Sequence, residues 1–344
     1  MTYVRYYKES DRQAWDAYVY RHPDSYHAHL IGWKDVIEQT YHKKPYYLIA
    51  EDNDIIEGVL PLFHIKSRIF GNQLVSMPYL TYGGIIADSN DIAKDLINKA
   101  LKIAKELGAV LELRQVNPLD ENSYDSKKTK INTTKVSMRL DLPENSDALF
   151  KSFKAKLRSQ IRRPQKEGMV FKLGGREFID DFYKVFAVNM RALGSPVHSK
   201  KLFVELFNRL EDTAKIGVVF FNRIPVASGI ITLFNKYVEI PWASTIRKYN
   251  RFSPNMLLYW GLFEYVTNGE YKIFDFGRSA IGKATYKFKK QWGSQPITLN
   301  WYSNESHKDS TIGYKKNIFI NIWCNLPLFL TNTIGPYVRK SITL

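Results

Sequence analysis

The sequence predicts an α/β (α+β) protein built from two copies of one unit. The length of 344 residues fits two domains of about 150 residues each. Hydrophobic residues make up 44% of the chain and charged residues 24%, which is typical of a packed globular protein. A hairpin–helix–strand pattern occurs once in the first half and once in the second, and such repetition indicates a duplicated fold.

The first copy begins with residues 46–65, where two apolar runs flank the polar segment Glu51–Asp54. This arrangement predicts a β-hairpin. Apolar residues then recur with helical spacing over Ile92–Leu107, and Gly108 follows as a glycine that ends a helix. A short strand is predicted over Val110–Arg114.

The second copy repeats these features in the same order. Residues 216–235 form a second predicted hairpin around the polar pair Asn222–Arg223. Pro254 lies at the start of a predicted helix, Asn255–Thr267, and a short strand follows at Ile273–Phe276. We therefore expect the two halves to fold alike.

The segment between the copies is predicted to contain a polar loop, a strand and three helices. The loop is Asp120–Asn132, and the strand is Lys135–Leu140. The first helix, Ser146–Arg163, is strongly basic and begins with a serine N-cap. The other two helices are expected at 176–190 and 199–210.

Charge and cysteine content narrow the class of protein. The net charge of +16 indicates an anionic partner, such as nucleic acid, a phosphorylated substrate or an acidic membrane surface, or simply a basic soluble surface. The single cysteine, Cys324, excludes disulfides and cysteine-based zinc sites and fits a reducing, cytoplasmic compartment. The seven histidines do not form a metal-binding pattern, so no metal is expected.

Motifs of several enzyme classes do not occur in the sequence. The phosphate-binding loop of nucleotide hydrolases, the dinucleotide-binding glycine pattern and the nucleophile elbow of hydrolases are all missing. The N-terminal residues have no apolar leader, and no apolar run reaches the roughly 20 residues that a membrane-spanning helix needs.

Arg158 and Arg162 lie one turn apart in the basic helix, on the same face as Lys154. An arginine pair with this spacing can bind phosphate through paired hydrogen bonds. The alternative is that this face is merely the solvated side of an amphipathic helix, whose apolar stripe contains Leu157 and Ile161.

A second basic segment, residues 277–296, alternates aromatic residues with lysines. Its aromatic residues are expected to anchor the segment while its lysines reach a cleft. A lysine in a cleft can stabilise a developing oxyanion or a phosphate. The alternative is a basic surface helix held by its aromatic side chains. The candidate site residues here are Arg278, Tyr286, Lys289 and Lys290.

Small polar residues follow the predicted strand Lys236–Ile240. Trp242 and Ser244 are candidates because residues at the end of such a strand often line a site in α/β folds. On the neighbouring strand, Asp275 is either a base or, as we favour, an anchor for Arg278.

Six segments in order resemble the FemAB-related branch of the GNAT acyltransferase superfamily, and most closely its members associated with exopolysaccharide and PEP-CTERM systems. The resemblance extends from about residue 1 to 335 and is most specific at 270–296. The segments are LRSQIRRPQKEG (157–168), NMRALGSPVHSKKLF (189–203), IPVASG (224–229), SPNMLLYWGLFEY (253–265), FDFGRS (274–279) and TYKFKKQWG (285–293).

This resemblance implies a fold of two tandem GNAT domains, each a mixed, mostly antiparallel sheet flanked by helices. It also implies transfer of an acyl or aminoacyl group to an amine on a cell-wall, polysaccharide or nucleotide-sugar precursor. The donor would be aminoacyl-tRNA or acyl-CoA, used as a co-substrate with no permanently bound cofactor. The family's Phe-Lys pair corresponds to Phe288 and Lys289, its acceptor strand to Trp242 and Ser244, and its basic segment to Lys156, Arg158 and Arg162.

One departure bears on the donor. The glycine-containing loop that holds coenzyme A pyrophosphate in ordinary GNAT enzymes is missing, because Arg278–Ala284 has one residue too many. This favours an aminoacyl donor over acetyl-CoA. Two alternatives remain: a conventional acetyl-CoA-dependent N-acetyltransferase, and a non-catalytic protein that binds tRNA or membranes on a transferase scaffold.

The predicted domains are 1–140 and 141–311, followed by a tail, 312–344. The tail is apolar, contains tryptophan and has basic flanks, so it is expected either to lie in a membrane interface or to pack as a terminal helix over the core. The first possibility would make the protein peripheral on the inner face of the membrane. The expected partners are thus a nucleotide-sugar or lipid-linked saccharide, tRNA and, through the tail, a membrane surface.

Overall fold

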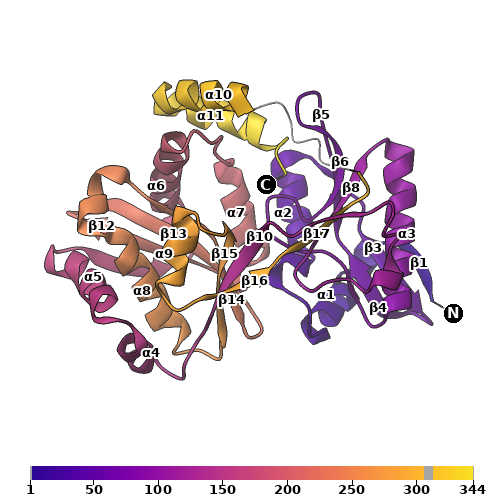
Figure 1. The fold of residues 1–344 in the computed structure, drawn as a ribbon, viewed down its shortest axis with the longest axis horizontal. Coiled ribbons are helices and arrows are strands. Elements are labelled where there is room, and N and C mark those ends of the chain that lie inside the picture. The colour runs from indigo at the N-terminus through magenta and orange to yellow at the C-terminus, as the bar shows by residue number, and fades with distance from the viewer. Residues whose placement is uncertain (1, 306–312, 344) are drawn as a thin grey trace. The chain divides into compact units, whose positions relative to one another are not determined.

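The computed structural model describes residues 2–305 and 313–343, and the chain forms two units (Figure 1). The N-terminal unit contains residues 1–136, 297–310 and 340–344, and the C-terminal unit contains 137–296 and 311–339. The sequence placed the boundary between the domains at residue 140, and the first segment of the C-terminal unit begins at Ser137. The predicted continuity differs, because two later segments return to the N-terminal unit.

The N-terminal unit has one four-stranded sheet, in the order β1-β3-β4-β7, and one six-stranded sheet, in the order β2-β5-β6-β8-β17-β9. Its elements are β1 (Tyr3–Tyr6), η1 (Glu9–Asp11), α1 (Arg12–Arg21), η2 (His27–His29), α2 (Gly32–Tyr41), β2 (Lys44–Pro45), β3 (Leu48–Asp52), β4 (Ile55–Leu60), β5 (Leu62–Ser67), β6 (Gly71–Ser76), β7 (Ile86–Ala87), α3 (Asn90–Leu107), β8 (Val110–Gln115), η3 (Glu121–Ser123), β9 (Lys130–Asn132) and β17 (Asn300–Ser303).

The C-terminal unit has a seven-stranded sheet in the order β11-β12-β13-β14-β15-β10-β16. Its elements are β10 (Lys135–Asp141), α4 (Ser146–Ser152), α5 (Ala155–Lys166), β11 (Val170–Gly174), η4 (Arg176–Phe178), α6 (Ile179–Ala192), α7 (Lys200–Arg209), η5 (Glu211–Thr213), β12 (Ala214–Phe221), β13 (Ile224–Phe234), β14 (Tyr237–Thr245), η6 (Arg247–Phe252), α8 (Pro254–Val266), β15 (Ile273–Ala280), α9 (Ala284–Lys290), β16 (Gln295–Thr298), α10 (Gly313–Asn325) and α11 (Leu328–Arg339).

Both predicted hairpins form, and both turn in the same way. β3 pairs antiparallel with β4 through Asn53-Asp54, and β12 pairs with β13 through Asn222-Arg223. All four turn residues have positive φ, between 48° and 66°. Such two-residue turns match the right-handed twist of the flanking strands, and asparagine and aspartate tolerate the conformation better than most residues.

The duplication extends to the helix and strand that follow each hairpin. In the N-terminal unit β6 and β8 are parallel and α3 connects to β8; in the C-terminal unit β14 and β15 are parallel and α8 connects to β15. Ser89 caps α3 by accepting from the Ile92 N–H, and Gly108 ends it with φ 57°. The predicted repeat of hairpin, helix and strand is therefore confirmed.

Aromatic residues form much of the core of the C-terminal unit. α8 is apolar on nearly all sides and is buried along most of its length. Phe263 packs edge-on against Phe274 at 4.8 Å and against Trp292 at 5.2 Å between ring centroids, while Trp260 contacts Phe150 at 5.0 Å. These contacts fix α4, α8 and the end of α9 against the sheet.

The predicted basic helix is two helices. α4 ends at Ser152, and α5 begins at Ala155 after Phe153, which is extended and buried. The predicted N-cap was also one residue off: Asn145, not Ser146, caps α4 by accepting from the Ala148 N–H at 2.9 Å. Burial of Phe153 against Trp260 and Trp292 outweighs continuation of the helix at this point.

Candidate functional site

The parallel strands β14 and β15 separate partway along their length. They pair from Tyr237 opposite Ile273 to Glu239 opposite Asp275, although β14 continues to Thr245 and β15 to Ala280. The separation follows from Gly277, whose φ of 71° turns β15 out of extended conformation. Beyond the last pair the two strands no longer pair with each other, and the separation leaves room for groups from other elements.

Lys289 of α9 lies at this separation. Its Nζ donates to the carbonyl oxygens of Gly277 at 2.8 Å and Arg278 at 2.9 Å. The side chain is buried, and burial lowers its pKa from 10.5 to about 8; the nearby carboxylates of Asp275 and Glu239 act in the opposite direction. The interpretation of this segment as a merely exposed basic helix therefore fails for Lys289.

Asp275 was expected to anchor Arg278, which stays a prediction; the hydrogen bonds of its carboxylate go to other groups. Its carboxylate accepts from Arg139 Nε at 2.9 Å, from the Gly277 N–H at 2.7 Å and from the Ser137 hydroxyl. The neighbouring strand β10, through Ser137 and Arg139, is thereby tied to the carboxylate beside the point at which β15 turns. The carboxylate is fully buried and committed to these donors, which fits a positioning role better than that of a base.

Trp242 and Ser244 lie within β14, beyond its last pair with β15; the strand continues to Thr245 and does not end at Ile240 as the sequence predicted. Trp242 packs edge-on against Phe203 with centroids 5.2 Å apart, and its side chain is buried. The Ser244 hydroxyl accepts from Asn189 Nδ2 at 3.1 Å. These contacts join α6 and α7 to this part of β14.

Four other predicted residues lie on surface helices. Arg158 donates to the Lys151 carbonyl at 3.2 Å, and Arg162 stacks over the Phe150 ring at 5.0 Å. Lys290 lies 5.8 Å from the Tyr286 ring centroid on the exposed side of α9. These contacts hold the arginines along α4 and α5 and bring Tyr286 and Lys290 together with each other.

A cavity of about 900 Å³ lies between α4, α5 and the end of α9. Three lysines line it, Lys154, Lys156 and Lys290, beside the aromatic side chains of Phe153 and Trp292. Neither Arg158 nor Arg162 is among the described residues that line this cavity. The basic helix thus contributes to a cavity through its first turn and not through the arginine pair that the sequence suggested.

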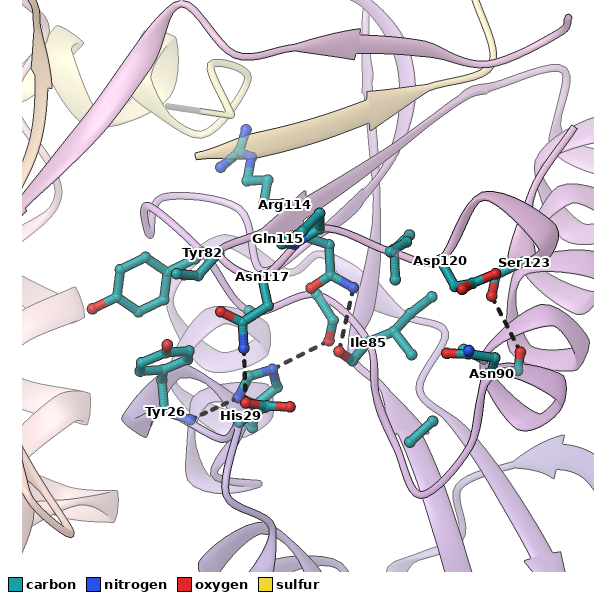
Figure 2. Close-up of a pocket in the computed structure, with 18 of the residues that line it drawn as sticks. Tyr26, His29, Tyr82, Ile85, Asn90, Arg114, Gln115, Asn117, Asp120 and Ser123 are labelled. Carbon is teal, nitrogen blue, oxygen red and sulfur yellow. Dashed lines mark hydrogen bonds between the residues drawn. The ribbon is translucent and has the colours of Figure 1, made fainter. Parts of the chain in front are cut away.

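The sequence analysis missed a second site, a polar pocket of about 110 Å³ in the N-terminal unit (Figure 2). It lies where β8 ends and α3 begins, just beyond the parallel pairing of β6 with β8. This position corresponds to the separation of β14 and β15 in the second copy. Its lining includes Tyr26, His29, Tyr82, Gln115, Asn117 and Asp120.

Hydrogen bonds fix the side chains around this pocket. His29 contacts the Gly84 carbonyl through Nε2 at 3.2 Å and the Tyr26 N–H through Nδ1 at 3.0 Å, so the ring is neutral. Burial lowers its pKa to about 3. Gln115 donates to the Ile85 carbonyl at 3.3 Å, and Asn117 donates to Asp24 at 2.7 Å.

The signal for this pocket in the sequence is the Tyr82-Gly83-Gly84 segment. A Cβ on Gly84 would overlap the Gln115 side chain and lie 3.0 Å from the Arg114 carbonyl oxygen, so only glycine fits. Gly83 has φ 141°, which other residues rarely adopt. Two adjacent glycines that follow a tyrosine mark a close approach of backbone to a site.

Residues 151–290 match the family described as an acetyltransferase (GNAT) domain. A search of curated proteins finds no match. Among solved structures, FemX is similar with a TM-score of 0.70 and 14% identity, covering 89% of this chain and 98% of FemX. The L-PGS of Bacillus licheniformis is similar with a TM-score of 0.56 and 14% identity, covering 93% and 99%.

A third similar structure is a tandem GNAT protein from the clavulanic acid biosynthesis pathway. Its TM-score is 0.53 and its identity 10%, over 90% of this chain and all of that one (100%). These likenesses, with the duplicated unit described above, show the tandem GNAT fold that the sequence predicted. Residues 151–290 thus match an acetyltransferase (GNAT) domain model, and the fold is similar to that of FemX and of a tandem GNAT protein.

Proposed function

We propose that the protein transfers an acyl or aminoacyl group to an amino group of a cell-wall, polysaccharide or nucleotide-sugar precursor, forming an amide. The observation that carries this proposal is Lys289, a buried ammonium at the point where β14 and β15 separate within a GNAT domain. The similarity of the fold to FemX and L-PGS supports an aminoacyl donor. The single cysteine supports a cytoplasmic setting.

The proposed reaction asks for little covalent chemistry from the protein. The neutral amine attacks the donor's carbonyl carbon, a C–N bond forms, and the C–O bond of an aminoacyl ester or the C–S bond of a thioester breaks. The amine proton passes to water, and the alcohol or thiol leaves. Orientation of the two substrates and stabilisation of the oxyanion supply most of the rate.

Lys289 is the proposed oxyanion donor. An ammonium has three N–H donors, and two of them point to the carbonyls of Gly277 and Arg278. These two hydrogen bonds fix the direction of the third N–H group of the ammonium. The backbone of β14 and β15 beyond their last pair would hold the donor in extended form, with Trp242 and Ser244 in the supporting wall.

The cations on the outer face of the C-terminal unit suit a phosphorylated substrate. Lys154, Lys156 and Lys290 line the cavity beside α5, and Arg158 and Arg162 extend the basic surface along that helix. Phosphate groups are present in aminoacyl-tRNA, acyl-CoA, nucleotide-sugars and lipid-linked saccharides alike. The shared chemistry of this surface is therefore phosphate binding, whichever donor and acceptor are used.

Calorimetry followed by transfer assays tests the proposal. Acetyl-CoA and an aminoacyl-tRNA minihelix are titrated first; micromolar binding of acetyl-CoA alone would favour the conventional N-acetyltransferase. Transfer to amino-bearing precursors is then measured with the donor that binds. Lys289→Met is expected to lower kcat by about 100-fold with KM little changed, as loss of one oxyanion donor does.

Lys287→Met is the matched control, because Lys287 is an exposed lysine on the same helix. It should retain wild-type kcat. Undiminished transfer by Lys289→Met would remove Lys289 from the reaction. Donor binding without transfer to any amine would support the non-catalytic alternative, a tRNA-binding protein on a transferase scaffold.

A further inference from the structure

The helices α10 and α11 form a hairpin that joins at Leu326-Pro327 (Figure 1). Proline at this position cannot donate to the preceding helical turn, which is why the segment breaks there. Both helices pack against α6 in the C-terminal unit. None of the helices within residues 2–305 and 313–343 is long and apolar enough to cross a bilayer.

The inner face of the hairpin is firmly seated. Trp323 is buried, and Arg191 donates to the Leu326 carbonyl at 3.2 Å. Gly335 is packed so closely that an added Cβ would lie 2.9 Å from the Val197 side chain. Arg339 Nε lies 2.9 Å from His198 Nε2. The expectation that the tail packs over the core therefore describes this face.

The outer face is exposed and mostly apolar, with Asn321, Asn325 and Thr333 as its exposed polar residues among those described. Five large side chains project from it, with exposed fractions between 41% and 68%: Phe319, Ile322, Phe329, Ile334 and Tyr337. They fall within 19 residues of sequence, and three of the five are aromatic. Because the inner face already fixes the hairpin, packing within the chain does not require this apolar surface. A cluster of this kind marks an interaction site.

The charge of the segment indicates which partner covers it. From residue 310 to 344 the sequence has no acidic residue and four basic ones, Lys315, Lys316, Arg339 and Lys340. The whole chain carries a net charge of +16. A second copy of the same chain would bring equal positive charge to the contact, whereas an anionic lipid surface would neutralise it.

We propose that the outer face of the α10–α11 hairpin lies in the interface of an anionic bilayer. The aromatic and isoleucine side chains would enter the boundary between headgroups and acyl chains, where the excess positive charge of the segment favours anionic lipid. A helix pair that lies flat, with one face seated on its own protein, is the geometry of a peripheral anchor. This inference depends on the hairpin alone and is independent of the transferase chemistry.

Vesicle flotation tests it with the full-length protein. Vesicles of phosphatidylglycerol and phosphatidylcholine in equal parts are compared with phosphatidylcholine alone, in low and high salt. Wild type should float with the anionic vesicles and be released in part by salt. The double variant Ile322→Asp and Phe329→Asp should lower the partition coefficient at least about tenfold.

The matched control is Ile224→Asp, since Ile224 is an exposed isoleucine at the first position of β13, next to the turn from β12. It should float as wild type does. Circular dichroism and gel filtration establish that each variant is folded. Equal flotation of the double variant and wild type, or no flotation of wild type, would overturn the proposal. A third outcome would also overturn it: wild type is a dimer that binds no vesicles, and the double variant is a monomer. A second copy of the chain would then cover the outer face.

Discussion

Replacement of Lys289 by methionine keeps the volume of the side chain but removes its charge. Two hydrogen bonds from a charged donor contribute about 3–6 kcal/mol together, and the Gly277 and Arg278 carbonyls would lose them. Burial of the charge opposes this by about 3 kcal/mol, since the pKa falls from 10.5 to about 8 and each unit corresponds to about 1.4 kcal/mol. We expect a net loss of about 0–3 kcal/mol at pH 7.

The pH dependence provides the sharper readout. Because the folded pKa of Lys289 lies below its unfolded value, the unfolded chain binds more protons between about pH 8 and 10.5. Wild type should therefore gain stability relative to Lys289→Met as pH rises through this window, by up to about 3 kcal/mol. Below about pH 8 the difference should be constant.

Urea denaturation, monitored by tryptophan fluorescence at intervals from pH 7 to 10.5, measures the difference in unfolding free energy between wild type and Lys289→Met. The contributions of other titrating groups cancel in this difference. The Lys287→Met protein should follow the wild-type profile. A constant difference between wild type and Lys289→Met across the whole range would refute the burial of a charged ammonium at this position. If Lys289→Met does not fold, Lys289→Arg, which keeps the positive charge, is measured in its place.

Three further predictions concern the two sites. Asp275→Asn breaks a buried ion pair and should lower the free energy of unfolding, measured by urea denaturation, by about 3–5 kcal/mol. Asp181→Asn, which breaks a surface ion pair, should lower it by about 0–1 kcal/mol. Burial lowers the folded pKa of His29 to about 3, so the free energy of unfolding should fall as pH decreases from about 6.5. NMR should show a neutral His29 ring down to pH 5. A protonated ring at pH 5 would contradict its burial. Gly84→Ala should displace Gln115 and destabilise the fold by about 1–3 kcal/mol, whereas unchanged thermal unfolding would show that the pocket adapts.

Local signals in the sequence were sufficient for most of the fold. The helical spacing over Ile92–Leu107, ended by Gly108, and the polar turns at residues 53–54 and 222–223 specify elements within a few residues of chain. Elements of this kind depend on residues close together in the sequence, through helix propensity, capping and turn chemistry. The family resemblance added the tandem arrangement, and the observed repeat agrees with it.

Long-range contacts decided the details that the sequence analysis got wrong. Phe153 interrupts the basic helix because Trp260 and Trp292, more than 100 residues later, bury it. The polar pocket joins side chains from His29 to Asp120, and no local pattern brings them together. The segment around Tyr302 returns to the N-terminal unit because its strand completes the six-stranded sheet beside β8.

The excess of positive charge, the duplicated unit and the lysine after Phe288 are properties of the sequence by itself, because each depends on composition or on nearby residues. Only the tertiary structure decided what each cation does. It buried Lys289 against two carbonyls, placed Lys154 and Lys156 at a cavity, and left Arg158 and Arg162 along a surface. The physical reason is that the environment of a charge is set by groups that are distant in sequence, and burial and hydrogen bonding then determine its chemistry.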